Sequence, residues 1–296
     1  MTLPYTLTLV ARRDAGTLTQ AVIEAARELV SGQPATVLSD GEAVDIPCSA
    51  PAPGGPSLNE IRGHFAGQAI DVLLTRSRGR RKGLLVADMD STIVCSETLD
   101  ELAARAGVGE QVAAITRRSM NGEIDFAVAL RERVALLKGL DASALEATWA
   151  ETRLTPGART LVATMRAHNA TTALVSGGFT WFTSRVAASC GFDIHHANQL
   201  GIERDRLTGR VAEPILGREA KLESLRSLAG SRGLRLAATL AVGDGANDLD
   251  MLREAGLGIA FHAKPVVAEA VSNRIDHADL RALLFAQGYR AADFTE

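Results

Sequence analysis

The stretch VADMDST, residues 86 to 92, ends an apolar run with two aspartates one residue apart, Asp88 and Asp90. The apolar letters LLVA at residues 84 to 87 predict a buried strand. Two carboxylates held close together repel one another unless a cation lies between them. The stretch therefore predicts a buried β-strand whose carboxyl end carries a cation-binding loop.

The composition is typical of a globular protein with room for two domains. The chain has 296 residues, of which 46% are hydrophobic, and its formal net charge is -3. This charge argues against a broad nucleic-acid-binding surface. No window approaches the roughly 20 apolar residues of a membrane span, and MTLPYTLTLVARRD lacks the cationic start of a signal peptide. We expect no membrane partner and a cytoplasmic location.

The first 76 residues alternate between strand-like and helix-like segments in a β-α-β-β-α-β order. An Asp-Gly pair at residues 40 and 41 lies where a tight hairpin turn would use it. This order predicts a small ferredoxin-like α+β domain over residues 1 to 76. Residues 77 to 83 belong to the charged stretch RSRGRRKG and are predicted to be a linker.

The rest of the chain, residues 84 to 296, is predicted to form an α/β domain. The segments LLVA, TALVS, AATLAVGD, GLGIA and RIDH are strand-like, and most are continuously apolar, which is typical of a parallel, Rossmann-like sheet between helix layers. Residues 96 to 155 contain no strand-like run and have helical periodicity, so we expect an inserted helical cap. Residues 198 to 212 are expected to form a short polar hairpin.

Polar residues follow three of these predicted strands. The site of an open α/β sheet forms outside the carboxyl ends of its strands, so these residues should meet. They are Asp88, Asp90, Ser176, Gly177, Gly178, Asp244, Asn247 and Asp248. Asp88, Asp90 and Asp244 supply the hard oxygen ligands that Mg²⁺ prefers.

Two other motifs are excluded by single residues. An EF-hand loop that begins at Asp88 would place Ile93 where glycine is needed and Leu99 where a bidentate glutamate is needed. A dinucleotide fingerprint in GDGAND would require glycine where Asp248 stands. The remaining interpretation is phosphoryl transfer, which needs positioning, charge neutralisation, a nucleophile and a proton donor.

Each of these requirements has a candidate residue. Asp88 can attack phosphorus, and Asp90 can protonate the departing alkoxide and later deprotonate water. The Ser176 hydroxyl and the backbone N–H groups beside it can hold phosphate oxygens. Lys221 can neutralise both nucleophile and phosphate, because in GREAKLESLRSL it lies in phase with Leu225 and Leu228. The alternative for Lys221 is a side chain that extends to solvent.

In this order DMDST, SGG, Lys221 and GDGAND resemble the four motifs of the haloacid-dehalogenase-like phosphatases, over residues 84 to 290. With the helical cap, they are most similar to the phosphoserine phosphatase group. The resemblance implies that Asp88 is the nucleophile and a metal ligand, and that Asp90 is the acid/base and binds the metal through its carbonyl. It further implies a last metal ligand, Asp244, phosphate binding by Ser176, Gly177 and Lys221, and support of metal and substrate by Gly178, Asn247 and Asp248.

The cap contains a charged residue on an apolar stripe. Phe126, Leu130, Arg133 and Leu137 follow 4-3-4 spacing, so Arg133 occupies the stripe and needs an anion. That anion is either a glutamate of the cap or a substrate carboxylate held by a bidentate fork. Glu97 could bind an ammonium group or only stabilise a helix N-terminus.

The resemblance extends to the substrate. In the phosphoserine phosphatase group, residues that match Glu97, Met120, Phe126 and Arg133 contact the amino-acid part of the substrate. This implies hydrolysis of O-phospho-L-serine, the last step of serine biosynthesis. Two alternatives stay open, a phosphotransferase that uses another alcohol as acceptor and an amino-acid sensor with a vestigial phosphatase domain. The N-terminal order also resembles ACT-type regulatory domains, which implies an L-serine effector and a homodimer.

Overall fold

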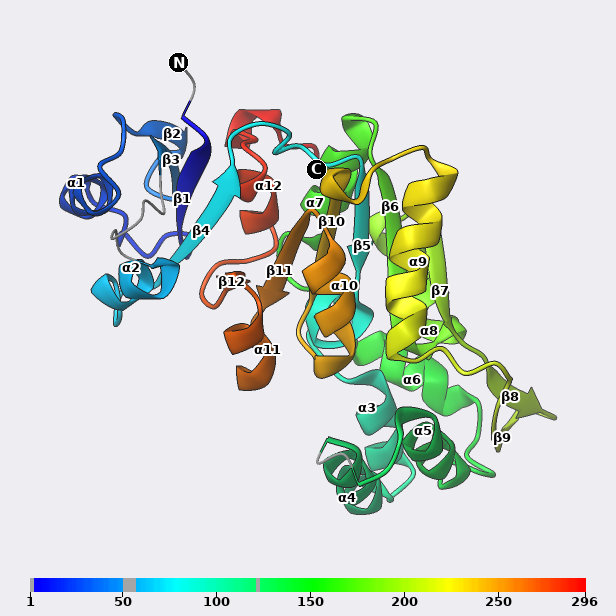
Figure 1. Ribbon diagram of the computed structural model, residues 1–296. Helices are drawn as coiled ribbons and strands as arrows, with labels where there is room; N and C mark the ends of the chain where they lie inside the picture. The colour runs from blue at the N-terminus through cyan, green and yellow to red at the C-terminus, as the bar shows by residue number, and fades with distance from the viewer. Residues whose placement is uncertain (1–2, 50–56, 121–122) are drawn as a thin grey trace.

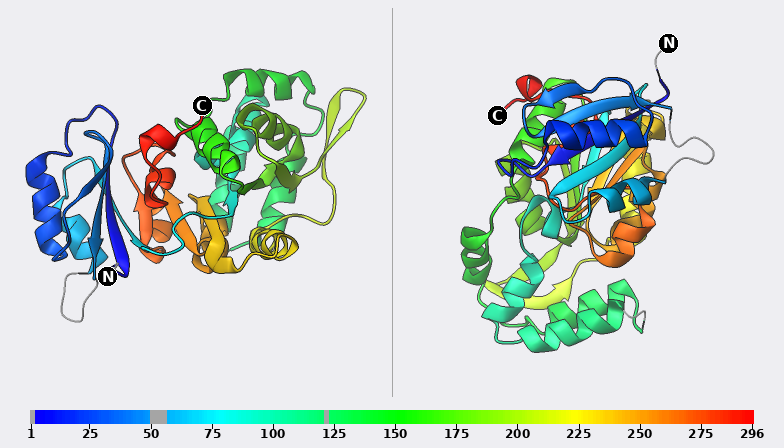
Figure 2. Two further views of the ribbon diagram at one scale, coloured as in Figure 1. Left: turned by 90° about the horizontal axis from the view of Figure 1, so that it is seen from above. Right: turned by 90° about the vertical axis from the view of Figure 1, so that its left-hand side faces the viewer.

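The computed structural model describes residues 3–49, 57–120 and 123–296. It contains a small antiparallel sheet near the N-terminus and a larger parallel sheet between helices, with helices α3 to α6 at one end of the larger sheet (Figure 1). The small sheet and the hairpin β8–β9 lie at opposite ends of the molecule (Figure 2). This is the predicted α/β fold class with a preceding α+β unit.

The N-terminal unit has the predicted β-α-β-β-α-β order. Its elements are β1 (Tyr5–Ala11), α1 (Gln20–Leu29), β2 (Thr36–Ser39), β3 (Ala43–Cys48), α2 (Leu58–His64) and β4 (Ile70–Arg76). The strand order is β2-β3-β1-β4 and each pair is antiparallel, as expected for a ferredoxin-like sheet. Thr19 caps α1, and Ser57 with Glu60 forms a capping box at the start of α2.

The N-terminal sheet is buried on both faces. Helices α1 and α2 pack on one face around Leu7, Leu9 and Ile61. The other face belongs to the main core and meets helix α12 (Ala282–Ala286), while β4 lies against β12 (Asn273–Ile275). The division into domains at a linker of residues 77 to 83 stays a prediction, because the unit shares a buried core with the rest of the chain.

The larger sheet has the strand order β12-β11-β10-β5-β6-β7, and all its pairs are parallel. Its further strands are β5 (Leu84–Ala87), β6 (Thr171–Phe179), β7 (Ile194–Asn198), β10 (Thr239–Gly243) and β11 (Leu257–Phe261). We did not expect β7, because IHHAN lacks the apolar run of a central strand. It forms an edge of the sheet, where less of the side-chain surface is buried.

Helices cover both faces of this sheet. On one side lie α7 (Ala158–Ala167), α8 (Thr180–Cys190) and α12, and on the other lie α9 (Arg218–Ser231), α10 (Leu249–Glu254) and α11 (Pro265–Ala270). Alternate residues of β5 face the two layers, Leu85 and Ala87 one layer and Leu84 and Val86 the other. This double coverage explains why the central strands are apolar throughout.

The insertion between β5 and β6 is helical, as predicted. It contains α3 (Thr98–Arg105), α4 (Gly109–Met120), α5 (Phe126–Ala135) and α6 (Ser143–Glu151). The predicted hairpin is present as β8 (Leu200–Glu203) and β9 (Arg206–Val211), and β9 packs against α5. Among the described residues, no helix is long and apolar enough to cross a membrane.

Candidate functional site

The site forms at the carboxyl edge of four adjacent strands, β11, β10, β5 and β6. Asp88 follows β5, Asp244 follows β10, and Ser176 lies in the last part of β6. Lys221 comes from α9, which packs on the same sheet. The structure thus brings together the residues that sequence reasoning placed at separate strand ends.

A tight turn after β5 directs the two aspartates in different directions. Ser91 has a φ of 54°, a left-handed conformation that is uncommon outside glycine, and the Val94 N–H donates to the Met89 carbonyl at 3.0 Å. The Asp90 carboxylate accepts a hydrogen bond from the Thr98 N–H at 3.0 Å. A Cβ on Gly178 would lie 2.9 Å from Asp90 Oδ2, so a side chain there would collide with this carboxylate.

Lys221 is buried between two carboxylates and does not extend to solvent. Its Nζ lies 2.6 Å from Asp88 Oδ1 and 2.6 Å from Asp248 Oδ1, and only 2% of the side chain is exposed. The other carboxylate oxygen of Asp248 accepts from the Gly245 N–H at 3.0 Å. Burial alone would lower the Lys221 pKa, but the two carboxylates outweigh this effect and hold the pKa above its ordinary value.

Three carboxylates crowd the strand ends. Asp88, Asp244 and Asp248 each offer an oxygen, and these oxygens lie within 4.8 Å of one another. Burial and then the charge of Asp88 raise the pKa of Asp244 to about 6 and that of Asp248 to about 7. The negative charge of these buried carboxylates exceeds the single positive charge of the buried Lys221. Such a set of carboxylate oxygens fits a divalent metal ion.

Asp90 stands apart from this cluster. Loss of water around its carboxyl group is the main cause that raises its pKa to about 8, and the charge of Glu97 adds to the effect. A carboxyl group that keeps its proton near neutral pH suits a general acid. Of the predicted metal ligands, the structure groups the side chains of Asp88 and Asp244 with Asp248, while the side chain of Asp90 bonds the start of α3.

The end of β6 forms a small polar cradle. The Gly178 N–H donates to Ser176 Oγ at 2.9 Å. Asn198, at the end of β7, donates through Nδ2 to the carbonyls of Gly177 at 2.8 Å and Leu216 at 3.2 Å. We did not foresee Asn198, because the strand that carries it was not expected.

The cap places two of its predicted residues over this edge. Glu97 Oε1 accepts from the Ser91 hydroxyl at 2.9 Å. The Phe126 ring lies against the β6 end, with Cζ 3.0 Å from the position of a Cβ on Gly177. Glu97 is the N-cap residue of α3 and makes no side-chain capping bond to it. Met120 ends α4, and its side chain lies outside the described part of the structure.

Arg133 is half-buried and forms no ion pair with a described carboxylate. Its Nε donates to the Ala129 carbonyl at 3.3 Å, within its own helix. Burial lowers its pKa, and the charges of Asp100 and Glu97 oppose that shift. Of the two alternatives for Arg133, the salt bridge to a glutamate of the cap is therefore not found among the described residues.

Lys264 is a further charged residue that we did not single out. Its Nζ lies 3.5 Å from Asp244 Oδ2 and 3.8 Å from Glu97 Oε1, so it links the sheet edge to the entrance of the cap. Lys264 follows β11. Inspection of the residues after the predicted strand GLGIA, as was done for three other strands, would have found it. Asn247 lies beside Gly245, its Oδ1 2.4 Å from the position of a Cβ there.

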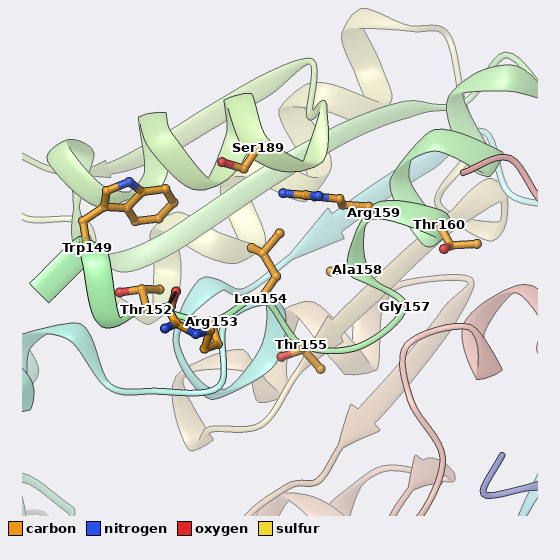
Figure 3. Close-up of a pocket in the computed structure, with 10 residues that line it drawn as sticks. All are labelled: Trp149, Thr152, Arg153, Leu154, Thr155, Gly157, Ala158, Arg159, Thr160 and Ser189. Atoms are coloured by element: carbon orange, nitrogen blue, oxygen red, sulfur yellow. Dashed lines mark hydrogen bonds between the residues drawn. The ribbon is translucent and has the colours of Figure 1, made fainter. Parts of the chain in front are cut away.

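A separate cavity of about 410 Å³ lies between α6, the start of α7 and α8 (Figure 3). Trp149, Arg153 and Arg159 are among its lining residues. None of the residues predicted for the site lines it. A search for cavities alone would therefore not have found the carboxylates.

Comparisons with known proteins agree with this geometry. The family model of the haloacid dehalogenase-like hydrolases matches residues 85–253. A phosphoserine phosphatase of Streptomyces coelicolor is 46% identical over 222 residues, which is 75% of this chain and 54% of the relative. The chain thus spans about half the length of that curated relative.

Two solved structures are similar. A haloacid dehalogenase family hydrolase from Salmonella enterica superposes with a TM-score of 0.84 at 28% identity, covering 95% of this chain and 97% of the other. A phosphoserine phosphatase solved as a phospho-aspartyl intermediate analogue has a TM-score of 0.65 at 40% identity, covering 69% of this chain and 98% of the other. The first likeness extends over the N-terminal unit, and the second is limited to about two thirds of the chain.

Proposed function

The chain belongs to the haloacid dehalogenase-like hydrolases, and from this premise we propose that it hydrolyses O-phospho-L-serine to L-serine and phosphate. The reaction is Mg²⁺-dependent, proceeds through an aspartyl-phosphate on Asp88 and completes serine biosynthesis. The observation that carries the proposal is the buried Lys221, bound to Asp88 and Asp248 beside Asp244. Its support includes the relatives named phosphoserine phosphatase.

The first step transfers the phosphoryl group to the protein. A carboxylate oxygen of Asp88 attacks phosphorus, and the bond between phosphorus and the serine oxygen breaks. Asp90 gives its proton to the departing alkoxide. With a pKa of about 8, Asp90 still carries this proton at neutral pH. L-serine leaves with that proton, and Asp90 is left ionised.

The second step restores the enzyme. Asp90 takes a proton from a water molecule as that water attacks phosphorus, and the bond from phosphorus to the Asp88 oxygen breaks. Phosphate leaves, Asp88 is again a carboxylate and Asp90 is again protonated. Ser176 and the glycine N–H groups of β6, with Lys221, hold the phosphate oxygens and neutralise their charge in both steps.

Asp88, Asp244 and the backbone carbonyl of Asp90 would hold the Mg²⁺ ion, with Asp248 and Asn247 in support. When bound, the ion supplies positive charge that neutralises the carboxylates and the phosphate. In this proposal Asp248 also fixes Lys221 against Asp88, because Asp248 Oδ1 accepts a hydrogen bond from Lys221 Nζ at 2.6 Å. It also occupies the space beside Gly243, where a Cβ would lie 2.4 Å from Asp248 Cγ.

Arg133 and Glu97 give the substrate preference in this proposal. The guanidinium of Arg133, which has no described carboxylate partner, binds the carboxylate of phosphoserine, and Glu97 binds its ammonium group. Phe126 packs against Gly177 and Gly217 and closes the apolar side of the site. A substrate without the amino-acid part would leave the Arg133 guanidinium without the carboxylate that it binds in phosphoserine.

The proposal includes an L-serine effector and a homodimer formed through the N-terminal unit. Strand β2 is an edge of the small sheet, and Val37 on it is 54% exposed, so this edge is accessible to a second copy. Sedimentation of the whole chain tests the dimer. A monomer at all concentrations would remove this part of the proposal and leave the phosphatase unaffected.

The direct test measures phosphate release from O-phospho-L-serine with and without Mg²⁺. Phosphothreonine, a sugar phosphate and a simple aryl phosphate serve as comparison substrates. We expect a strong, Mg²⁺-dependent preference for phosphoserine. Activity on the aryl ester without activity on phosphoserine would contradict the substrate, and no hydrolysis of any ester would contradict the phosphatase.

A further inference from the structure

The side chain of Lys264 extends across the site from a well-anchored backbone. The Lys264 N–H donates to the Asp244 carbonyl at 3.1 Å, and the Lys264 carbonyl accepts from the N–H groups of Val267 at 2.9 Å and Ala268 at 3.0 Å. Pro265 follows as the first residue of α11 and restricts the backbone of the residue before it. Lys264 is therefore fixed both to the residue after β10 and to the first turn of α11.

The ammonium group of Lys264 lies between two carboxylates from different parts of the site. Its Nζ is 3.5 Å from Oδ2 of Asp244, which follows β10, and 3.8 Å from Oε1 of Glu97, the N-cap residue of α3. The side chains of Lys264 and Glu97 are 45% and 47% exposed. Because about half of each side chain is in contact with water, the ion pair between cap and sheet edge has moderate strength.

The two carboxylate oxygens of Glu97 differ in their contacts. Oε1 accepts a hydrogen bond from the Ser91 hydroxyl at 2.9 Å and forms the ion pair with Lys264. In the part of the chain that the structure describes, no hydrogen bond reaches Oε2. Both oxygens of a carboxylate can accept. Glu97 is thus held through one oxygen and can bind a further cation through the other.

Negative charge surrounds Glu97 at this edge of the sheet. The carboxylates of Asp88 and Asp244 repel it. Among the described residues, Lys264 is the one cation that forms an ion pair with Glu97. Without this cation, the repulsion would favour conformations in which the half-exposed Glu97 side chain turns to solvent. Lys264 is therefore placed to keep the Glu97 carboxylate over the sheet edge.

We propose that Lys264 is a positioning residue that holds the Glu97 carboxylate for the ammonium group of the substrate and so favours amino-acid phosphates over other esters. The inference rests on the proposed function, which places that ammonium group on Glu97. The lysine binds Oε1, and the ammonium group of the substrate binds Oε2. In this role Lys264 contacts no reacting atom, and the chemical steps belong to Asp88 and Asp90.

The test compares two esters on the full chain and on Lys264→Met, which removes the charge and keeps a long side chain. The first ester is O-phospho-L-serine, and the second is phosphorylated 3-hydroxypropanoate, which is phosphoserine without its ammonium group. We expect KM for phosphoserine to rise about threefold to fivefold, the effect of losing a half-exposed ion pair, with kcat unchanged. Neither constant should change for the second ester. Lys264→Arg, which keeps the cation, should restore most of the affinity for phosphoserine.

Glu97→Gln shows whether Lys264 acts through Glu97. Once Glu97 has lost its charge, Lys264→Met should have no further effect on KM for phosphoserine, so the two changes are not additive. Lys138→Met removes the same charge from an exposed lysine of the cap and is the matched control, which should leave KM for both esters unchanged. Additive losses from Lys264→Met and Glu97→Gln would overturn the proposal.

The other outcomes separate this proposal from its alternatives. A lower KM for phosphoserine in Lys264→Met would show that the lysine competes with the ammonium group, and would overturn the proposal. Calorimetric titration with Mg²⁺ tests the contact with Asp244, and a higher Kd for Mg²⁺ with an unchanged preference between the esters would assign Lys264 to metal binding instead. An unaltered chain that hydrolyses neither ester contradicts the proposed phosphatase and this proposal with it. An unaltered chain that prefers phosphoserine, with the same preference in Lys264→Met, contradicts this proposal alone.

Discussion

Two groups of buried charged residues in this molecule differ in their balance of charge. At the carboxyl edge of the larger sheet, one buried lysine faces the carboxylates of Asp88, Asp248 and Asp244. At the junction of the two sheets, the buried cations Arg80 and Arg281 each have an acid of their own, Asp45 and Glu42. The first group carries excess negative charge, and the second is close to neutral.

The junction shows what a structural charge network looks like. The Arg80 and Asp45 side chains are 12% and 11% exposed. Arg80 also donates to Thr8 Oγ1 at 3.0 Å and to the carbonyls of Phe285 at 3.1 Å and Ala286 at 3.2 Å. Its donors are thus matched by acceptors from both units. Such a network stabilises the contact between them and requires no ligand.

The sheet edge has the opposite character. Its raised carboxyl pKa values arise because burial and mutual repulsion disfavour ionisation. A protein keeps such a group of acids at a cost to its stability, which is typical of sites where charge serves catalysis or metal binding. The difference between the two groups gives four predictions, ordered from the largest expected effect to the smallest.

Asp88→Asn should abolish turnover while leaving the fold intact. We expect phosphate release to fall by about 10⁴-fold or more, which corresponds to roughly 5.5 kcal/mol of lost transition-state stabilisation. The melting temperature of the metal-free variant should not fall, because one of the repelling carboxylates is gone and Lys221 keeps Asp248. Substantial remaining turnover would overturn the covalent mechanism.

Asp45→Asn should have the reverse profile. It leaves the Arg80 guanidinium buried without its acid, and breaking such a pair costs about 3 kcal/mol of the free energy of unfolding. Phosphate release per folded molecule should stay unchanged. Urea denaturation measures the free energy of unfolding, and steady-state kinetics measures the phosphate release. A loss of activity without a loss of stability would show that the junction takes part in the reaction.

Arg133→Ala tests a cation that has no described acid of its own. On phosphoserine we expect kcat/KM to fall by about 10²-fold, or roughly 2.7 kcal/mol, because the substrate carboxylate loses its partner. On a phosphate ester without a carboxylate the change should be small. Arg131→Ala, on the same helix with an exposed ion pair to Glu213, is the control. Equal losses on both substrates would show that Arg133 only supports the cap.

The stability of the metal-free protein should fall as the pH rises from about 4 to about 8. Asp90, Asp248 and Asp244 have folded-state pKa values of about 8, about 7 and about 6, all above the usual 3.8. The folded state therefore binds more protons than the unfolded state in this window, and raising the pH favours unfolding. Mg²⁺ should flatten this dependence. Unfolding at several pH values checks it, and a rise in stability towards pH 8 without metal would contradict it.

Sequence reasoning placed correctly those residues whose position depends on a preceding apolar strand. Asp88, Ser176 and Asp244 lie at one edge of the parallel sheet that the same apolar runs predict, and their roles in the reaction stay predictions. The helical cap was recognised from its periodicity. Lys221 required one further step, its phase with Leu225 and Leu228 on α9.

The parts that were missed depend on contacts between distant segments. Asn198 lies on an edge strand whose polar letters give no strand signal. A cavity between the N-terminal unit and the larger sheet is lined by Arg62 and Arg274, which are far apart in the sequence and come together because β4 lies beside β12. No local pattern indicates that the linker residue Arg80 would be buried against Asp45.

The central claim is that the unbalanced carboxylates of the sheet edge hold a divalent ion, and calorimetric titration with Mg²⁺ tests it most directly. Three proteins are compared, the unaltered chain, Asp244→Asn and Asp45→Asn. The account predicts that the unaltered chain and Asp45→Asn bind Mg²⁺ equally well and that Asp244→Asn loses the binding. Absence of binding in the unaltered chain, or equal binding in Asp244→Asn, would contradict it.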